Sequence, residues 1–420
     1  MSKTEMPSIR FYGFDDAWEQ RKLGDNIAEY TEKTTINNQY PVLTSSRRGI
    51  FFQTDYYDGN QIASADNTGY NIVPYGYFTY RHMSDDEIFH FNINDITENG
   101  IVSTLYPVFT TDENLDSRYL QYQLNYGKEF AKYAILQKQG GSRTYMYLNK
   151  LKELRLTIPN FVEEQKKISA YFMKLDNLIT LHQRKFEKLT NVKKSMLEKM
   201  FPQNGSCYPE IRFKGFTDPW EQRKFGEVFM SLQNNTLSRA ELNDEFGAAQ
   251  NIHYGDVLIK YDEILDVSKE PLSYIEKQSI ADKFKTSYLQ NGDVIIADTA
   301  EDETVGKCTE IEGLTDQKVI SGLHTMPVRP NRKFASGFLG FYLNSAAYHD
   351  QLKPLMQGIK VTSISKGAMQ DTVVKFPLDL KEQEQIGIYF GGLDHLITLH
   401  QRELEKLQNI KKSLLEKMFV

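Results

Sequence analysis

Two stretches of the chain, residues 175–200 and 393–418, carry apolar residues three or four positions apart over an unusual length. Apolar residues at this spacing fall on one face of an α-helix. Neither stretch contains proline or glycine, so nothing in them interrupts a helix. With starts near Glu163 and Glu382, the pattern predicts two amphipathic helices of about 38 residues, each roughly 57 Å long. Helices of that length need a partner surface for their apolar faces.

The segments that precede these helices, residues 25–158 and 227–376, show a different pattern. Short apolar or alternating runs are separated by turn signals. Strands are predicted for GIFFQ (49–53), YGYFTY (75–80), DVLIKY (256–261), DVIIAD (293–298) and HTMPVRP (324–330). Helical spacing is expected at 116–137 and 335–355. The predicted fold class is therefore α+β, with two globular α/β domains separated by two long helices.

The chain also repeats itself. Residues 9–24, IRFYGFDDAWEQRKLG, return as 211–226, IRFKGFTDPWEQRKFG, and residues 171–201 return as 389–419 with identity at 23 of 31 positions. The intervening segments show almost no mutual likeness. Two constant parts therefore perform one task twice, and two variable parts perform different versions of another. The division that follows is a first domain at 1–158, a first helical spacer at 159–205, a second domain at 206–376 and a second helical spacer at 377–420.

The two long helices most simply pack on each other as an antiparallel coiled coil, with a pseudo-twofold axis relating the two halves of the internal repeat. The alternative is that each helix only covers its own domain. Polar residues on the outer faces recur between the copies, which indicates that identical partners dock on both halves, although a recent duplication could produce the same likeness. The predicted partner-binding residues are Asn191, Lys194, Glu198, Asn409, Lys412 and Glu416.

Composition restricts the classes of protein to be considered. A net charge of −6 argues against a nonspecific polycation but leaves room for a local basic surface. Cys207 and Cys308 lie in different repeats without CxxC spacing, and the histidines lack metal-ligand spacing, so neither a disulfide framework nor a metal site is predicted. No apolar run reaches membrane-spanning length, and MSKTEMPSIR lacks the pattern of a signal peptide. These features favour a cytoplasmic protein without membrane contact.

Polar and basic residues gather in predicted loops of both domains. Their side chains present the donors that contact phosphates and base edges in nucleic acids, and the alternative is an ordinary polar loop. KQGGSRT at 138–144 aligns with MQGIKVT at 356–362, and each supplies a Gly-bearing turn with a basic residue and a threonine. The predicted DNA-binding residues are Arg47, Arg48, Lys138, Arg143, Thr144, Asn234, Arg239, Lys360 and Thr362.

In the order of its parts and in their residues, the chain resembles the specificity subunits of type I restriction-modification systems. The likeness covers nearly the whole chain and rests on duplicated motifs: WEQRK, the QGG and QGI turns, TIPNFVEEQKKI and KFPLDLKEQEQI, and LDNLITLHQR and LDHLITLHQR. The resemblance implies that each variable segment is a target recognition domain for one half of a split, asymmetric site in double-stranded DNA. It also implies that the helices set the gap between the half-sites.

The same resemblance implies partners and cofactors. The helices are expected to bind two methylation subunits that modify adenine, and restriction and translocase subunits are expected in the full complex. No cofactor is expected on this chain, whereas S-adenosylmethionine, ATP and Mg²⁺ are expected on the partner subunits.

Motifs for catalysis are missing from the sequence. An adenine methyltransferase calls for an NPPY-like or DPPY-like tetrapeptide, which VPYG at 73–76 is not, and no Walker A sequence is present. The acidic cluster of Asp298, Glu301, Asp302 and Glu303 could suggest a nuclease, but no equivalent is evident in the first half. A non-catalytic recognition subunit is therefore expected. The alternatives are a stand-alone nuclease or methyltransferase built on a recognition scaffold, and a purely structural coiled-coil scaffold.

Overall fold

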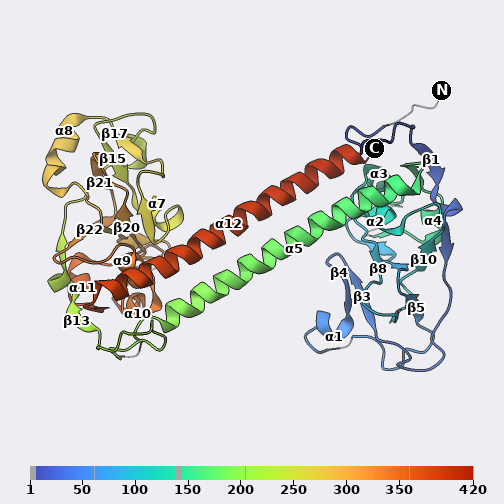
Figure 1. The fold of residues 1–420 in the computed structure, drawn as a ribbon, viewed down its shortest axis with the longest axis horizontal. Helices are drawn as coiled ribbons and strands as arrows, with labels where there is room; N and C mark the ends of the chain where they lie inside the picture. Colours follow the sequence, from blue (N-terminus) through green and yellow to red (C-terminus); the bar gives the residue numbers. More distant parts are fainter. Residues whose placement is uncertain (1–5, 61, 139–142, 204, 359, 420) are drawn as a thin grey trace. The chain divides into compact units, whose positions relative to one another are not determined.

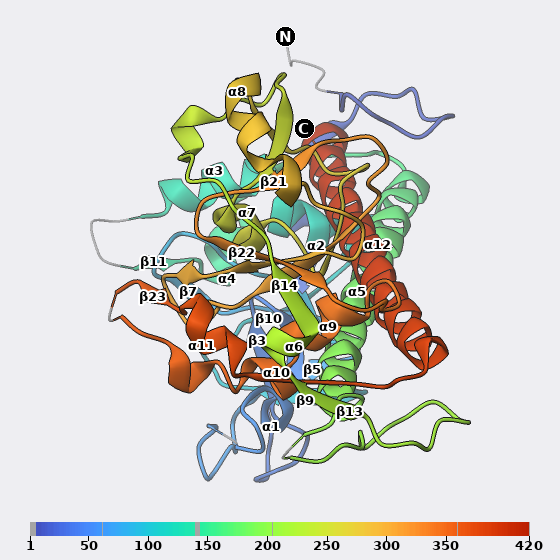
Figure 2. The same cartoon turned by 90° about the vertical axis from the view of Figure 1, so that its left-hand side faces the viewer.

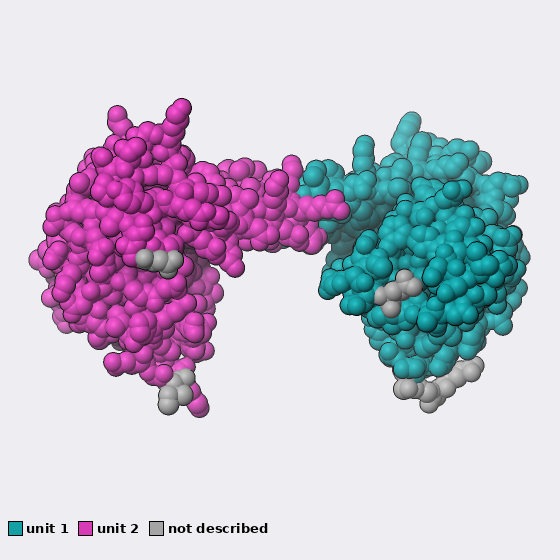
Figure 3. All heavy atoms as spheres, turned by 90° about the horizontal axis from the view of Figure 1, so that it is seen from below, with its two compact units in different colours: residues 1–182, 402–420 teal, residues 183–401 magenta. Residues whose placement is uncertain are grey.

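The chain forms two compact units. Unit 1 comprises residues 1–182 and 402–420, and unit 2 comprises residues 183–401 (Figure 3). Unit 1 is therefore discontinuous in sequence. The division into recognition domains and helical spacers rests on the repeat rather than on compactness, and it stays a prediction. The computed structural model describes residues 6–60, 62–138, 143–203, 205–358 and 360–419.

Unit 1 is built from short strands and helices (Figure 1). Its four-stranded antiparallel sheet has the order β2–β10–β6–β8, and the pairs β1–β12, β3–β4, β5–β9 and β7–β11 accompany it. Its helices are η1 (Leu23–Asp25), α1 (Gln53–Tyr56), α2 (Ser117–Tyr126), α3 (Lys128–Leu136) and α4 (Leu148–Lys152). Its strands are β1 (Glu19–Lys22), β2 (Ile27–Glu29), β3 (Leu43–Ser46), β4 (Gly49–Phe52), β5 (Asn71–Pro74), β6 (Phe78–Thr79), β7 (Met83–Ser84), β8 (Asn92–Ile93), β9 (Asn99–Val102), β10 (Val108–Thr111), β11 (Thr144–Tyr145) and β12 (Arg155–Ile158).

Unit 2 has larger sheets, including a five-stranded mixed sheet in the order β14–β22–β18–β20–β16 and a three-stranded sheet in the order β17–β15–β21 (Figure 2). The pairs β13–β24 and β19–β23 complete its strands in the described part of the chain. These strands are β13 (Glu221–Lys224), β14 (Phe229–Ser231), β15 (Ala249–Ile252), β16 (Ile264–Asp266), β17 (Ser273–Ile275), β18 (Val294–Ala297), β19 (Thr299–Ala300), β20 (Cys308–Glu312), β21 (Val319–Ser321), β22 (Thr325–Pro330), β23 (Thr362–Ser363) and β24 (Val373–Phe376). The shorter helices are α6 (Phe225–Val228), η2 (Arg239–Glu241), α7 (Tyr254–Ile259), α8 (Gln278–Ala281), η3 (Asp282–Ser287), α9 (Phe338–Asn344), α10 (Ala346–His349), η4 (Lys353–Leu355) and α11 (Lys366–Gln370).

Two long helices, α5 (Val162–Lys199) and α12 (Leu380–Met418), confirm the prediction from periodicity. Each helix contributes one part to each unit. Leu178 and Leu396 belong to the apolar spacing that predicts one buried face on each helix, but they are 41% and 42% exposed. They occupy equivalent positions in the two copies, so the exposure is itself repeated.

In unit 1, the first part of α5 lies antiparallel to the last part of α12. Phe172 stacks on Phe419, with 5.7 Å between ring centroids, and Asp176 pairs with Lys411 at 2.6 Å. Moving forward along α5 therefore means moving backward along α12. Phe419 is 4% exposed and belongs to the apolar core of unit 1.

In unit 2, the last part of α5 lies antiparallel to the first part of α12. Lys193 pairs with Asp394 at 2.7 Å, and Phe201 stacks on Phe390 at 5.7 Å. Phe201 is fully buried in the core of unit 2. The same contacts thus occur in both units with the roles of the two helices exchanged, which confirms the predicted antiparallel pairing and internal repeat.

The repeated sequence motifs have a structural cause. Arg10 forms two hydrogen bonds with Glu164, at 2.6 and 2.8 Å, and Arg212 forms the same two with Glu382, at 2.6 and 2.8 Å. Both carboxylates are buried. Removing one member of such a pair leaves an uncompensated buried charge and costs about 3–5 kcal/mol, which explains why each repeat carries both the arginine of the IRF motif and the glutamate of the helix start.

The strand pair β1–β12 of unit 1 and the strand pair β13–β24 of unit 2 have the same register. Glu19 of β1 lies opposite Ile158 of β12, and Glu221 of β13 lies opposite Phe376 of β24. Both pairings follow the same 202- and 218-residue offsets as the sequence repeat. The constant motifs therefore build one frame twice, and the variable segments are inserted into it.

One predicted strand is wrong. DVLIKY at 256–261 lies largely in α7, not in a strand. His253 caps this helix, because its ring nitrogen accepts a hydrogen bond from the Gly255 amide. Val257 faces the core at 0% exposure, while Ile259 is 88% exposed. A six-residue apolar run fits a short helix as well as a strand, and the cap decides between them. The other predicted strand runs each contain a strand.

Candidate nucleic-acid interface

The β3–β4 hairpin carries two predicted DNA-binding residues, Arg47 and Arg48, at its turn. The Ser46 hydroxyl donates to the Gly49 carbonyl at 3.1 Å and accepts from the Arg48 amide at 3.1 Å, which closes the turn. Gly49 has φ +122°, a conformation that disfavours any other residue. The Arg48 guanidinium lies over the ring of Tyr56, 5.3 Å from its centroid. Both arginines are exposed at the surface of unit 1.

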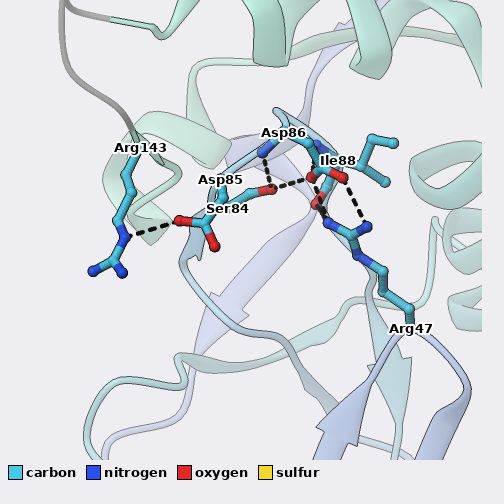
Figure 4. Close-up of polar contacts among 6 residues, drawn as sticks. All are labelled: Arg47, Ser84, Asp85, Asp86, Ile88 and Arg143. Atoms are coloured by element: carbon cyan, nitrogen blue, oxygen red, sulfur yellow. Dashed lines mark hydrogen bonds and ion pairs between the residues drawn. The ribbon is translucent and has the colours of Figure 1, made fainter.

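Arg47 is held by an acidic run, residues 85–87, that follows β7 (Figure 4). Both of its terminal guanidinium nitrogens bind the carboxylate of Asp86, one of them at 2.8 Å. The Ser84 hydroxyl also donates to Asp86, at 2.8 Å. The Arg47 guanidinium, with help from Ser84, holds the pKa of Asp86 well below its usual range. The charge on Arg47 is therefore matched within the protein.

Two more predicted DNA-binding residues meet the same acidic run. Arg143 Nε donates to a carboxylate oxygen of Asp85 at 2.8 Å, and this hydrogen bond raises the pKa of Arg143 (Figure 4). The Lys138 ammonium pairs with the Glu87 carboxylate. All four of these side chains are partly or largely exposed. Three cations that are distant in sequence therefore face three consecutive carboxylates.

The pairing of β7 with β11 brings these residues together. Thr144 of β11 lies opposite Ser84 of β7, so Arg143 enters the strand pair where the acidic run leaves it. Thr144 itself is 1% exposed, and its hydroxyl forms no hydrogen bond with any described residue. This burial places the Thr144 side chain inside unit 1, and a DNA contact through it would require the strand pair to open.

A hollow of about 240 Å³ lies between the β3–β4 hairpin and the acidic run. Arg81, Tyr56, Tyr57 and Tyr106 line it together with Arg47. Arg81 is exposed and forms no ion pair with another described residue. Sequence reasoning did not single out Arg81 or the tyrosines, because a lone arginine in GYFTYRH carries no spacing signal. A cation beside aromatic rings suits contact with phosphates and bases.

The predicted residues of unit 2 are engaged in local contacts. The Asn234 side chain donates to the Gly322 carbonyl at 3.2 Å. Arg239 is 54% exposed and donates to Asp256 at 2.7 Å. The neighbouring Asn235 is 1% exposed and therefore structural. Arg239 therefore presents an exposed guanidinium whose charge is matched by Asp256.

The repeated Gly-bearing turns are described only in part. Residues 139–142 and residue 359 lie outside the described residues. Lys360 is exposed, and Thr362 is half-buried in β23, opposite Ala300 of β19. Thr144 and Thr362 therefore occupy the same place in the two strand pairs, as the sequence alignment of the turns predicts.

The acidic cluster of the second half has an equivalent in the first half, contrary to the expectation from the sequence. Thr362 lies opposite Ala300 just as Thr144 lies opposite Ser84, so residues 301–303 follow β19 where residues 85–87 follow β7. The two acidic runs are 216 residues apart, whereas the turns and long helices repeat at an offset of 218. The runs are therefore out of alignment when the sequence is compared at the offset of 218. Among the described residues, the run at 301–303 forms no ion pair.

All six predicted partner-binding residues are exposed. Those on α5 belong to unit 2, and those on α12 belong to unit 1. Within unit 1, a groove of about 490 Å³ is lined by residues of α12 together with Tyr126 and Asp176. The six residues are Asn191, Lys194 and Glu198 on α5, and Asn409, Lys412 and Glu416 on α12.

Two lysines between the helices were missed from the sequence. Lys411 pairs with Asp176 in unit 1, and Lys193 pairs with Asp394 and with Glu263, at 2.7 and 2.9 Å, in unit 2. Their side chains are only 15% and 17% exposed. Burial alone would lower the pKa of Lys193, but the two carboxylates outweigh it and the pKa is raised. These reciprocal pairs fix the register of the helices inside each unit.

The described residues contain neither a metal-binding cluster nor a membrane-spanning helix. No group of three or more histidine, cysteine, aspartate or glutamate side chains is arranged to hold a metal ion among them. Within the same ranges, every helix is too short or too polar to cross a membrane.

The amino-acid sequence is similar to one protein family along most of its length. The family model for the type I restriction modification DNA specificity domain matches residues 15–191 and again 217–409. The type I restriction enzyme MjaVIII specificity subunit of Methanocaldococcus jannaschii is 24% identical over 328 residues, which cover 75% of this chain and 72% of that protein. The putative type I restriction enzyme MjaX specificity subunit of the same organism is 22% identical over 315 residues, 72% of this chain and 67% of that protein.

A solved structure shares the fold. The crystal structure of the type I restriction-modification system S subunit from M. genitalium covers 99% of this chain and 99% of its own, with a TM-score of 0.57 at 12% sequence identity.

Proposed function

Because the chain belongs to the family of type I restriction-modification DNA specificity proteins, we propose that its two variable segments recognise the two halves of a bipartite, asymmetric DNA site. The observation that supports this most strongly is that the constant motifs build the same frame in both units, while the variable segments inserted into it differ. Unit 1 holds a four-stranded antiparallel sheet in this frame, and unit 2 holds a five-stranded mixed sheet. Two unlike readers on one chain call for two unlike half-sites.

In unit 1, the surface proposed to meet DNA is the hollow between the β3–β4 hairpin and the acidic run. Arg81 and Arg48 are exposed cations that form no ion pair with other described residues, and Tyr56 and Tyr57 lie beside them. Phosphate contacts by arginine position a protein on the duplex, and donors aimed at base edges give specificity. The local basic surface is compatible with the overall charge of −6.

The long helices are proposed to set the gap between the half-sites. Each is continuous over 38 or 39 residues, and each is fixed in register inside both units by the Lys411–Asp176 and Lys193–Asp394 pairs. A fixed link makes binding of the second half-site intramolecular, so affinity gains only when the half-sites have the matching spacing.

Partner binding is proposed on the repeated faces of the helices. Leu178 and Leu181 in unit 1 are 41% and 46% exposed, and their equivalents Leu396 and Leu399 in unit 2 are 42% and 44% exposed. Contiguous exposed apolar patches rimmed by polar residues mark protein–protein interaction sites, and these leucines are proposed to belong to one in each unit. Two methylation subunits are proposed to dock there and on the recurring polar residues. They would carry out adenine methylation, and restriction and translocase subunits would join them in the full complex.

The chain itself is proposed to be non-catalytic, with S-adenosylmethionine, ATP and Mg²⁺ bound by its partners. The experiment that tests this is to incubate the purified chain with DNA, S-adenosylmethionine, ATP and Mg²⁺, alone and with its partner subunits. Sequence-specific binding by the chain without methylation or cleavage supports the proposal. Methylation or cleavage by the chain alone would favour a stand-alone enzyme instead.

A further inference from the structure

Unit 1 neutralises part of its own candidate DNA surface. The acidic run at 85–87 supplies three carboxylates, and three of the basic residues predicted to contact DNA pair with them one to one. Figure 4 shows two of these pairs, Arg47 with Asp86 and Arg143 with Asp85. These pairs join segments 39 to 58 residues apart in sequence, so they are contacts of the fold rather than of neighbours along the chain. The net charge of the six side chains is zero.

The equivalent place in unit 2 differs. The run at 301–303 follows β19 in the same way, yet it forms no ion pair with the described residues, and Asp302 accepts only from Thr304. The acidic run is thus common to both units, whereas pairing with basic residues occurs in unit 1. This difference supplies a control of the same charge at the same structural position.

Little free energy is needed to break these ion pairs. Exposed ion pairs contribute little to stability because solvent screens them, and here the carboxylates of Asp85 and Asp86 are 66% and 46% exposed. A correctly placed DNA phosphate can therefore replace the carboxylate as the ion-pair partner of an arginine. A phosphate placed at random gains less, because the carboxylate that already neutralises the cation must be displaced before the phosphate can pair with it.

We propose that the acidic run at 85–87 is a built-in counter-charge that suppresses nonspecific DNA binding by unit 1. It holds Arg47, Arg143 and Lys138 on carboxylates until the phosphates of a matching half-site replace them. The run thereby raises the ratio of specific to nonspecific binding. This inference rests on the proposed recognition of DNA by unit 1.

The test is the triple variant Asp85→Asn, Asp86→Asn, Glu87→Gln in the full chain. Asn and Gln keep the shape and the acceptor oxygens, so the Ser84 hydrogen bond can persist. Binding to a random-sequence 20-base-pair duplex is measured by fluorescence anisotropy from 50 to 200 mM KCl. Three freed cations should steepen the slope of log affinity against log salt by about 2.7, and between these salt concentrations the affinity should fall roughly 40-fold more than in the unmodified chain.

The matched control is Glu301→Gln, Asp302→Asn, Glu303→Gln, which changes the net charge equally. A smaller change in slope than in the first variant supports the proposal, because the control releases no paired cation. An unchanged slope in the first variant, or equal slopes in both, would overturn it. If the first triple variant does not fold, Asp85→Asn alone frees only Arg143 and should steepen the slope by about 0.9.

The same titration with a duplex that carries the recognised site distinguishes failure of the counter-charge proposal from failure of DNA recognition by unit 1. If the unmodified chain prefers its site but the triple variant binds random DNA no better, the counter-charge is wrong and recognition stands. If the unmodified chain shows no sequence preference at all, recognition by unit 1 fails, and the counter-charge fails with it.

Discussion

Phe419 should be required for the stability of unit 1, although it lies more than 230 residues along the chain from the α5 residues that it contacts. Its ring is 4% exposed and lies 5.7 Å from the rings of both Phe172 and Tyr119. Replacing a buried phenylalanine with alanine costs about 3–5 kcal/mol through lost burial and the cavity left behind. Phe419→Ala should therefore lower the free energy of unfolding of unit 1 by that amount. The matched variant is Phe201→Ala, which makes the equivalent change in the core of unit 2.

Hydrogen exchange followed by mass spectrometry can localise the two effects. Phe419→Ala should reduce protection in α2 of unit 1 and spare α9 of unit 2, because α2 holds Tyr119 and α9 packs around Phe201. Phe201→Ala should do the reverse. The reasoning would be refuted if α2 kept its protection in Phe419→Ala, or if each variant loosened both helices equally.

Three further outcomes are expected. Burial raises the pKa of Glu310 from 4.5 to about 7, so the stability that its protonated form contributes is complete below pH 4.5 and is lost as the pH rises through 7. Glu310→Gln should remove this loss, which is worth up to about 3 kcal/mol, so between pH 5 and pH 7.5 the melting temperature of the unmodified chain should fall relative to that of the variant. Inserting four residues, about one helical turn, between Lys188 and Lys199 should change the gap between half-sites and keep their sequences, and an unchanged gap in methylation mapping would exclude the helices as the spacer. Reversing the charges of Lys194 and Glu198 together should weaken one methylation subunit more than the other, which native mass spectrometry would count directly, and full occupancy by both would exclude this surface.

The sequence predicted the long-range architecture well because its signals extend over many residues. Apolar spacing sustained through α5 and α12 leaves no competing assignment, and the offsets of 202 and 218 imply a repeated frame. Short signals were less secure. The run at 256–261 fits two structures, and a cap from His253, outside the run, selects the helix.

The candidate site was predicted only as a set of residues, because its geometry depends on contacts between distant segments. Arg47 and Arg143 were expected to face DNA directly, and nothing in their local sequence indicates that both meet the run at 85–87. Likewise Lys193 looks like any lysine on a polar helix face, and its burial follows from the position of Asp394 and Glu263 in the folded unit.

The most direct test of the account is to exchange one variable segment and map the methylated bases. Residues 25–158 would be replaced by the matching segment of a relative, and the genome of cells carrying this chain with its methylation subunits would be sequenced with detection of modified adenine. The account predicts that one half of the recognised site changes while the other half and the gap stay the same. A change in both halves together, or methylation at a single undivided site, would contradict recognition by two independent readers.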